Sequence, residues 1–176
     1  MVPIQKSPIP ANTFLASYSI AGGYVDCYCT EIPGQISFSE YIRSFYTTLL
    51  FRLERLLLKL AVSKPSTDKE AENLADGDIN MFAAWRVEKR TENELLMCDF
   101  RGRTRSWLMV TPVNTAYRAR TRLYFGSIIV PVRNPKTGEM SLGPVFQALL
   151  GFHKIYSILL LFSAARNVKH HDSRIS

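Results

Sequence analysis

Apolar and polar residues alternate in several stretches of the chain, and a period of two is typical of β-strands. Residues 24–31 follow the Gly22-Gly23 break and are rich in β-branched and aromatic side chains, which predicts a first strand. More strands are expected in four later segments separated by polar turns: 80–90, 94–100, 103–112 and 118–131. Connections this short favour antiparallel pairing of neighbouring strands.

A helical spacing of apolar residues begins after Ser37 and continues to Leu60. Ser37 and Glu40 have the spacing of a capping box, in which each side chain bonds the backbone N–H of the other residue. Thr47-Thr48 is the weak point of this stretch, since β-branched residues lower helix propensity. The pattern therefore leaves open whether one helix or two form here.

Two further helices are expected. Thr67 and Glu70 form a second capping-box pair, which predicts a short polar helix ending at Gly77. The segment 133–143 is expected to be a loop, and residues 144–167 the final helix.

This order of elements predicts an α+β fold, with an antiparallel β-sheet wrapped around a long C-terminal helix. The expected organisation is an N-terminal segment (1–23), a single domain (24–168) and a disordered tail (169–176).

Size and composition agree with one globular domain. The chain has 176 residues, of which 47% are hydrophobic and 21% charged, enough to bury a substantial core. The formal net charge of +7 favours anionic partners such as lipid headgroups, nucleic acid or acidic metabolites, but it selects none of them.

The three cysteines have no spacing typical of a disulfide framework. Cys27 and Cys29 are two positions apart on one strand and should share a face. Together with Cys98 and His153 they would give four residues of the types that bind zinc, but no CxxC pair supports a zinc site. Buried thiols, without a metal or a cofactor, are the prediction.

No targeting or membrane-spanning segment is evident. Prolines interrupt the first ten residues, and the apolar run that follows them is short, so no signal peptide is expected and the protein is predicted to be cytoplasmic. The apolar run at 155–165 is too short to cross a bilayer. Peripheral contact with a membrane remains open.

Six stretches carry a resemblance to a known superfamily: Phe45–Thr48, Phe51–Arg55, Phe82–Trp85, Gly102–Trp107, Leu123–Gly126 and Phe152–Ser157. With the order of elements, they make the chain similar to the helix-grip, START-like superfamily, and more closely to a group of uncharacterised bacterial proteins within or near it. The superfamily resemblance implies a cavity between the sheet and the last helix that commonly holds a lipid or other apolar ligand, and occasionally an active site. The closer group implies no catalytic residue.

The hairpin before Trp107 decides which side chains face such a cavity. If Arg101-Gly102 is a two-residue loop, three pairs lie directly opposite one another: Phe100 with Arg103, Cys98 with Arg105, and Leu96 with Trp107. Arg103, Arg105 and Trp107 would then point inward with Trp85 and Phe100. A similar loop at residues 92–93 would place Arg86 opposite Asp99 on the outer face, and a slip of one residue would reverse either assignment.

Two inward arginines allow three interpretations. Their stems could lie on the tryptophans near the rim of the sheet, with the charged ends in water. A ligand carboxylate or phosphate could neutralise them while Trp85, Phe100 and Trp107 hold its apolar body. An internal carboxylate such as Glu54 could also pair with them.

Two other groups could carry chemistry. His153 lies one helical turn before Tyr156 on the final helix, and could be a general acid or base or a structural residue. Arg118, Arg120 and Arg122 alternate along the last strand and should point outward, either as solvated charge or as a binding surface. No glycine-rich phosphate loop and no nucleophile–base pair is visible in the sequence.

The sequence thus predicts binding of a small amphipathic ligand, expected to be anionic, between the sheet and the C-terminal helix. The candidate ligand-binding residues are Trp85, Phe100, Arg103, Arg105, Trp107, His153 and Tyr156. A first alternative is an enzyme of the cyclase or lyase type that uses His153 as acid or base in the same cavity. A second is a basic surface module without a specific nucleic-acid target.

Overall fold

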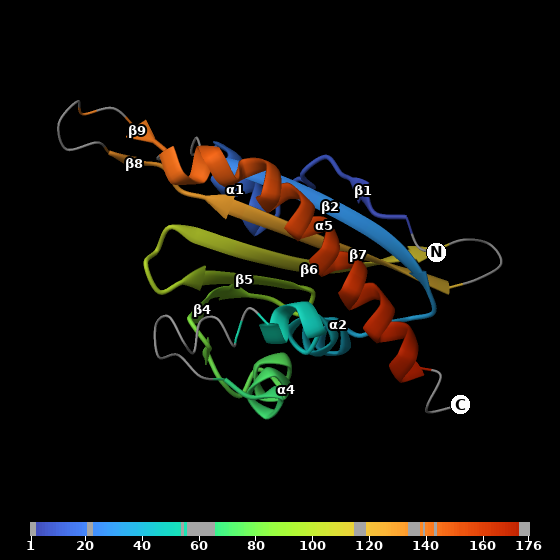
Figure 1. Cartoon of the computed structure of the whole chain (residues 1–176). Helices are drawn as coiled ribbons and strands as arrows, with labels where there is room; N and C mark the ends of the chain where they lie inside the picture. Colours follow the sequence, from blue (N-terminus) through green and yellow to red (C-terminus); the bar gives the residue numbers. More distant parts are fainter. Residues whose placement is uncertain are drawn as a thin grey trace.

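Seven antiparallel strands form one sheet, in the order β1-β2-β7-β6-β5-β4-β3 (Figure 1). The strands are β1 (Gln5–Lys6), β2 (Tyr24–Pro33), β3 (Met81–Phe82), β4 (Trp85–Arg90), β5 (Glu94–Asp99), β6 (Thr104–Asn114) and β7 (Ala119–Ile129). The computed structural model describes residues 3–20, 23–53, 55, 66–114, 119–133, 138, 140–142 and 144–172.

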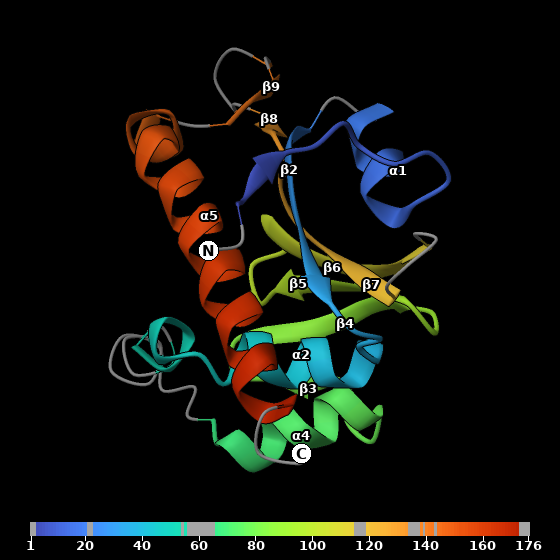
Figure 2. The same cartoon turned by 90° about the vertical axis from the view of Figure 1, so that its right-hand side faces the viewer.

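Helices cover both faces of this sheet. They are α1 (Phe14–Ile20), α2 (Phe38–Tyr46), α4 (Asp68–Asp76) and α5 (Pro144–Asp172). Figure 2 shows α5 along one side of the sheet and α1 on the opposite side. We call the face under α5 and α2 the inner face and the face under α1 the outer face. The predicted α+β class, with a C-terminal helix packed on an antiparallel sheet, is confirmed.

Local sequence signals set the ends of the short helices as predicted. Both capping boxes form, Ser37 with Glu40 at the start of α2 and Thr67 with Glu70 at the start of α4. The weak point at Thr47 is a true break, because α2 ends at Tyr46 and helical residues resume at 49. Gly77 ends α4 with a φ of 89°, a left-handed conformation that favours glycine.

Several boundaries differ from the prediction. The expected strand 80–90 is two strands, β3 and β4, joined by a tight turn in which Ala83 has a φ of 52°. The expected loop 133–143 overlaps a small hairpin of β8 (Val132–Arg133) and β9 (Met140–Ser141). α5 continues to Asp172, so the predicted tail begins inside the helix; residues 173–176 lie outside the described part. No helix in the described ranges is long and apolar enough to cross a membrane.

Each face of the sheet has its own apolar core. The inner core joins α2 and α5 to the sheet and contains Phe45, Leu108, Phe125 and Leu161. The outer core lies under α1 and is centred on Trp107, which is completely buried. Burial of one such side chain stabilises the fold by about 1.5–3 kcal/mol, so the N-terminal segment that covers it is an integral part of the domain.

Glu94 links α1 to the outer face of the sheet through hydrogen bonds. Its Oε1 atom accepts hydrogen bonds from the indole Nε1 of Trp107 and from the backbone N–H of Phe14, the first residue of α1. Glu94 is 6% exposed, so these donors compensate the loss of water around its carboxylate. The sequence pattern gave no sign of this contact.

We predict that Gly126→Ala destabilises the protein by about 1–3 kcal/mol, because overpacking forces neighbouring groups apart. An added Cβ would lie 2.8 Å from Leu15 Cδ2, 2.9 Å from the Asp26 carbonyl oxygen and 3.0 Å from Trp107 Cε3. Urea unfolding followed by tryptophan fluorescence measures the change. Gly151→Ala is the matched control: its Cβ meets no atom within 4 Å, and alanine within α5 should stabilise by about 0.5–1 kcal/mol. Equal stability of Gly126→Ala and the parent would contradict the packing described.

Candidate functional site

A cavity of about 150 Å³ lies between the inner face and α5. We call it the inner cavity. Aromatic and aliphatic side chains from α2, the sheet and α5 form most of its wall: Phe45, Phe51, Trp85, Phe125, Tyr156 and Leu160. Its polar lining includes Ser106, Ser127 and His153. Of the residues predicted from the sequence, four border this space: Trp85, Arg105, His153 and Tyr156.

The polar end of the inner cavity is a chain of three side chains. Asp26 on β2 lies directly opposite Ser127 on β7, and both are buried. Ser127 donates to Asp26 Oδ1 through its backbone N–H at 3.0 Å and through its hydroxyl at 2.6 Å. The same hydroxyl oxygen lies 2.6 Å from His153 Nε2, which is 3.7 Å from Asp26 Oδ2.

The ionised carboxylate fixes the direction of these hydrogen bonds. Because a carboxylate only accepts, the hydroxyl proton of Ser127 points to Asp26, and the Ser127 oxygen is left to accept. His153 then donates its Nε2–H to Ser127, so the lone pair of the neutral ring lies on Nδ1. Ser127 is thus a relay between histidine and aspartate rather than a nucleophile activated by the histidine.

Burial lowers the pKa of His153 below its ordinary value, and the negative charge of Asp26 opposes this shift. The ring is therefore neutral near pH 7. Tyr24 donates to Asp26 Oδ2 at 3.4 Å, and its own pKa is raised, first by burial and then by the nearby carboxylate. The cluster holds a neutral imidazole beside a compensated carboxylate.

The predicted hairpin register is confirmed, but the predicted direction of its side chains is wrong. Cys98 pairs with Arg105 and Leu96 with Trp107, as expected. Trp107, however, is buried in the outer core. Arg105 borders the inner cavity, but its guanidinium pairs with Glu88 at 3.2 Å and lies over the ring of Tyr18 in α1. Both side chains therefore point away from α5.

The remaining predicted residues lie near the hairpin turn. Phe100 is 51% exposed, and Arg103 donates to the backbone oxygen of Leu142. The connection is a four-residue loop, 100–103, rather than two residues. In the preceding hairpin Arg86 pairs with Cys98 instead of Asp99, because a bulge between Val87 and Lys89 shifts the register. Glu54 lies outside the described residues.

The cysteines and the last strand follow the expected alternation. Cys27 and Cys29 both pack on the outer core, while His153 approaches the inner face. Within the described ranges no three His, Cys, Asp or Glu side chains gather as a metal site. On β7, Thr121, Leu123 and Phe125 are buried, whereas Arg120 and Arg122 pair with Glu31 on the outer face. Arg118 is not among the described residues.

Asp26 and Ser127 were not identified from the sequence. One signal was present: Asp26 is an acidic residue among uncharged neighbours, since residues 24, 25 and 27–30 of the same strand carry no charge. Its partner Ser127 is 101 positions away, so only the pairing of β2 with β7 brings the two together.

We predict that His153 titrates below the usual value of about 6.5 and is protonated on Nε2 in its neutral form. Since the unfolded chain binds this proton at a higher pH, the free energy of unfolding should fall as pH is lowered from about 6.5 toward the folded pKa. Long-range ¹H–¹⁵N spectra of the imidazole measure both pKa and tautomer, and His153→Gln assigns the signal and should remove this part of the pH dependence. A pKa above 6.5, or an Nδ1–H tautomer, would refute the hydrogen-bond order described.

No protein-family model, no curated protein and no solved structure matches the chain.

Proposed function

We propose that the protein binds a small, largely apolar molecule carrying one hydrogen-bonding group in the inner cavity. The observation that carries this proposal is the composition of the cavity wall, which is mostly aromatic and aliphatic and includes the hydrogen-bonded pair His153 and Ser127. Apolar walls with a few convergent polar groups are typical of ligand sites.

The size of the cavity limits the ligand. A void of about 150 Å³ is large enough for a single aromatic ring. A larger molecule would place only one ring or a short chain inside and extend the rest toward the surface. Phe152 supports such an extension, because it stacks on Tyr156 at 5.9 Å and is 66% exposed.

The charges favour a neutral polar group over the anionic group expected from the sequence. Arg105 is neutralised by Glu88 on the outer face, and the carboxylate of Asp26 lies behind Ser127. Trp85 offers a donor instead: its indole Nε1 is buried and makes no hydrogen bond with the described residues. A hydroxyl or carbonyl oxygen on the ligand would satisfy this N–H.

The order of elements also supports an apolar ligand between the sheet and α5. One strand of the main sheet, a helical pair, a run of antiparallel strands and a long C-terminal helix resemble the helix-grip, START-like arrangement. A cavity between sheet and last helix commonly holds an apolar ligand in that arrangement. Fold likeness alone does not identify the ligand.

A second candidate is an enzyme that uses His153 as acid or base on a ligand in the same cavity. The fixed tautomer and lowered pKa of His153 favour it, since a neutral imidazole near pH 7 can accept a proton. In that case His153→Gln would bind the molecule extracted from the purified protein without converting it. Equal conversion by this variant would exclude the role.

We predict that p-cresol, which has one ring and one hydroxyl, binds the protein and raises its melting temperature. Ser106→Leu should abolish this shift, because the larger side chain occupies the inner cavity. Ser19→Leu, a matched change on the exposed side of α1, should leave it intact. Thermal unfolding with and without p-cresol measures the effect, and native mass spectrometry tests for a co-purified molecule. An equal shift in Ser106→Leu would show that p-cresol binds elsewhere.

A further inference from the structure

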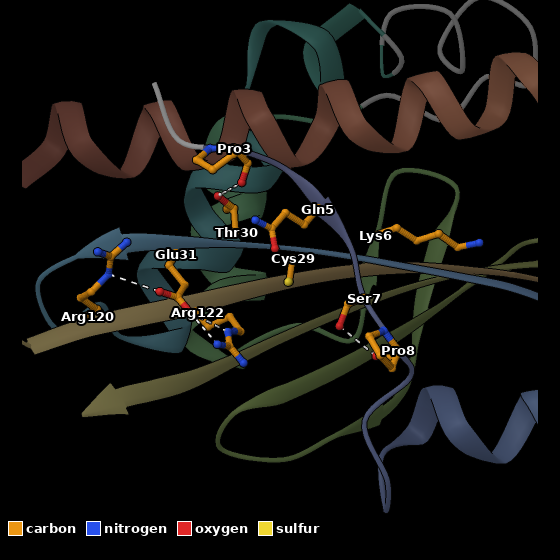
Figure 3. Close-up of a pocket in the computed structure, with 10 residues that line it drawn as sticks. All are labelled: Pro3, Gln5, Lys6, Ser7, Pro8, Cys29, Thr30, Glu31, Arg120 and Arg122. Carbon is orange, nitrogen blue, oxygen red and sulfur yellow. Dashed lines mark hydrogen bonds and ion pairs between the residues drawn. The ribbon is translucent and has the colours of Figure 1, made fainter. Parts of the chain in front are cut away.

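A second hollow lies on the outer face, beyond the area that α1 covers. Its volume is about 450 Å³, within the usual range of small-molecule pockets and three times that of the inner cavity. We call it the outer pocket. Figure 3 shows it between the N-terminal segment, from Pro3 to Pro8, and the strands β2 and β7.

Positive charge dominates the lining of the outer pocket. Arg120 and Arg122 alternate on β7 and both reach Glu31 on β2. Arg122 Nε lies 3.0 Å and its Nη2 2.5 Å from Glu31 Oε1, while Arg120 Nε lies 3.4 Å from Oε2. One carboxylate thus faces two guanidinium groups. Lys6, exposed on β1, adds a third cation at the rim, where Figure 3 shows it directed away from the arginines.

The two arginines can still receive an anion. Their side chains are 41% and 39% exposed, so a solute can reach them. The Nε atom of Arg120 is buried beside Glu31, so an anion would approach this side chain through its other guanidinium nitrogens. Hydrogen bonds to Tyr124 and Glu31 raise the pKa of Arg122, which therefore remains a cation at any physiological pH.

The charge balance selects the ligand class. Two guanidinium groups beside one carboxylate leave one positive charge next to Glu31, and Lys6 adds a second at the rim. A phosphomonoester carries about −1.5 to −2 charges near pH 7. Guanidinium groups bind phosphate oxygens in bidentate geometry, and two arginines can share the oxygens of one phosphate group. The less polar wall, formed by Pro3, Pro8 and Cys29, would contact the organic part of the ester.

We propose that the outer pocket binds a phosphomonoester group, held by Arg120 and Arg122 between the N-terminal segment and the sheet. This site is separate from the inner cavity, because Arg120 and Arg122 lie on the opposite face of the sheet from His153. The phosphate group belongs either to a soluble metabolite or to the headgroup of a lipid such as phosphatidic acid. Both sources offer the same chemistry to the two guanidinium groups.

Isothermal titration of the whole protein with phenyl phosphate tests the proposal. We expect binding that weakens at least tenfold in Arg120→Gln/Arg122→Gln. The matched control is Arg43→Gln/Arg52→Gln, which removes the same charge from two surface ion pairs elsewhere and should leave the affinity unchanged. Lys6→Glu, an exposed change that should not disturb folding, is expected to weaken binding severalfold.

Vesicles containing phosphatidic acid separate the two sources of phosphate. Binding of phenyl phosphate in solution supports a soluble ligand; binding to these vesicles alone, lost in Arg120→Gln/Arg122→Gln, supports a lipid headgroup. No binding to either probe, or an equal loss in Arg43→Gln/Arg52→Gln, would overturn the proposal. Equal affinity for benzoate would overturn the assignment to phosphate. The p-cresol shift should be unchanged in Arg120→Gln/Arg122→Gln, so that failure at one site is distinguishable from failure at the other.

Discussion

The buried carboxylate of Asp26 is the constraint on which the inner site depends. An ionised carboxylate that is 4% exposed is strongly destabilising unless donors replace the water it has lost. Tyr24 and Ser127 supply those donors from β2 and β7, and His153 joins them from α5 through the Ser127 hydroxyl. The same contacts that compensate Asp26 therefore hold α5 over the sheet and orient the imidazole at the end of the inner cavity.

Local structure could be predicted because its causes lie within a few residues. The two capping boxes and the end of α4 at Gly77 depend on chemistry close in the sequence. Thr47 was recognised as a weak point for the same reason, although the pattern left open whether one helix or two form there. The pairing of Cys98 with Arg105 was also predictable, since a short hairpin fixes its own register. The bulge between Val87 and Lys89 was not, because nothing in the alternation marks an extra residue.

The direction of the side chains could not be obtained in the same way. Alternation separates two sets of residues on a strand, but it identifies the inner set only when the other face meets water. Here α1 covers the outer face, and Trp107 with Glu94 forms a second core there. The N-terminal segment had too weak a pattern to reveal that cover. The charge of a side chain therefore did not indicate which face of the sheet it occupies. Arg105 points outward and is neutralised by Glu88, while the buried acid Asp26 points inward.

The two proposed sites use alternate residues of the same two strands. Asp26 and Ser127 face α5, whereas Glu31 and Arg122, also directly paired across β2 and β7, face the outer pocket. The inner pair is buried, so its polar groups must be satisfied by protein or by a ligand with matching hydrogen bonds. The outer pair is partly exposed, so water and ions compete there, and binding must come from excess positive charge rather than from desolvation. Successive side chains on a strand point to opposite faces of the sheet. The same pair of antiparallel strands can therefore carry a buried hydrogen-bonding site on one face and a solvent-accessible cationic site on the other.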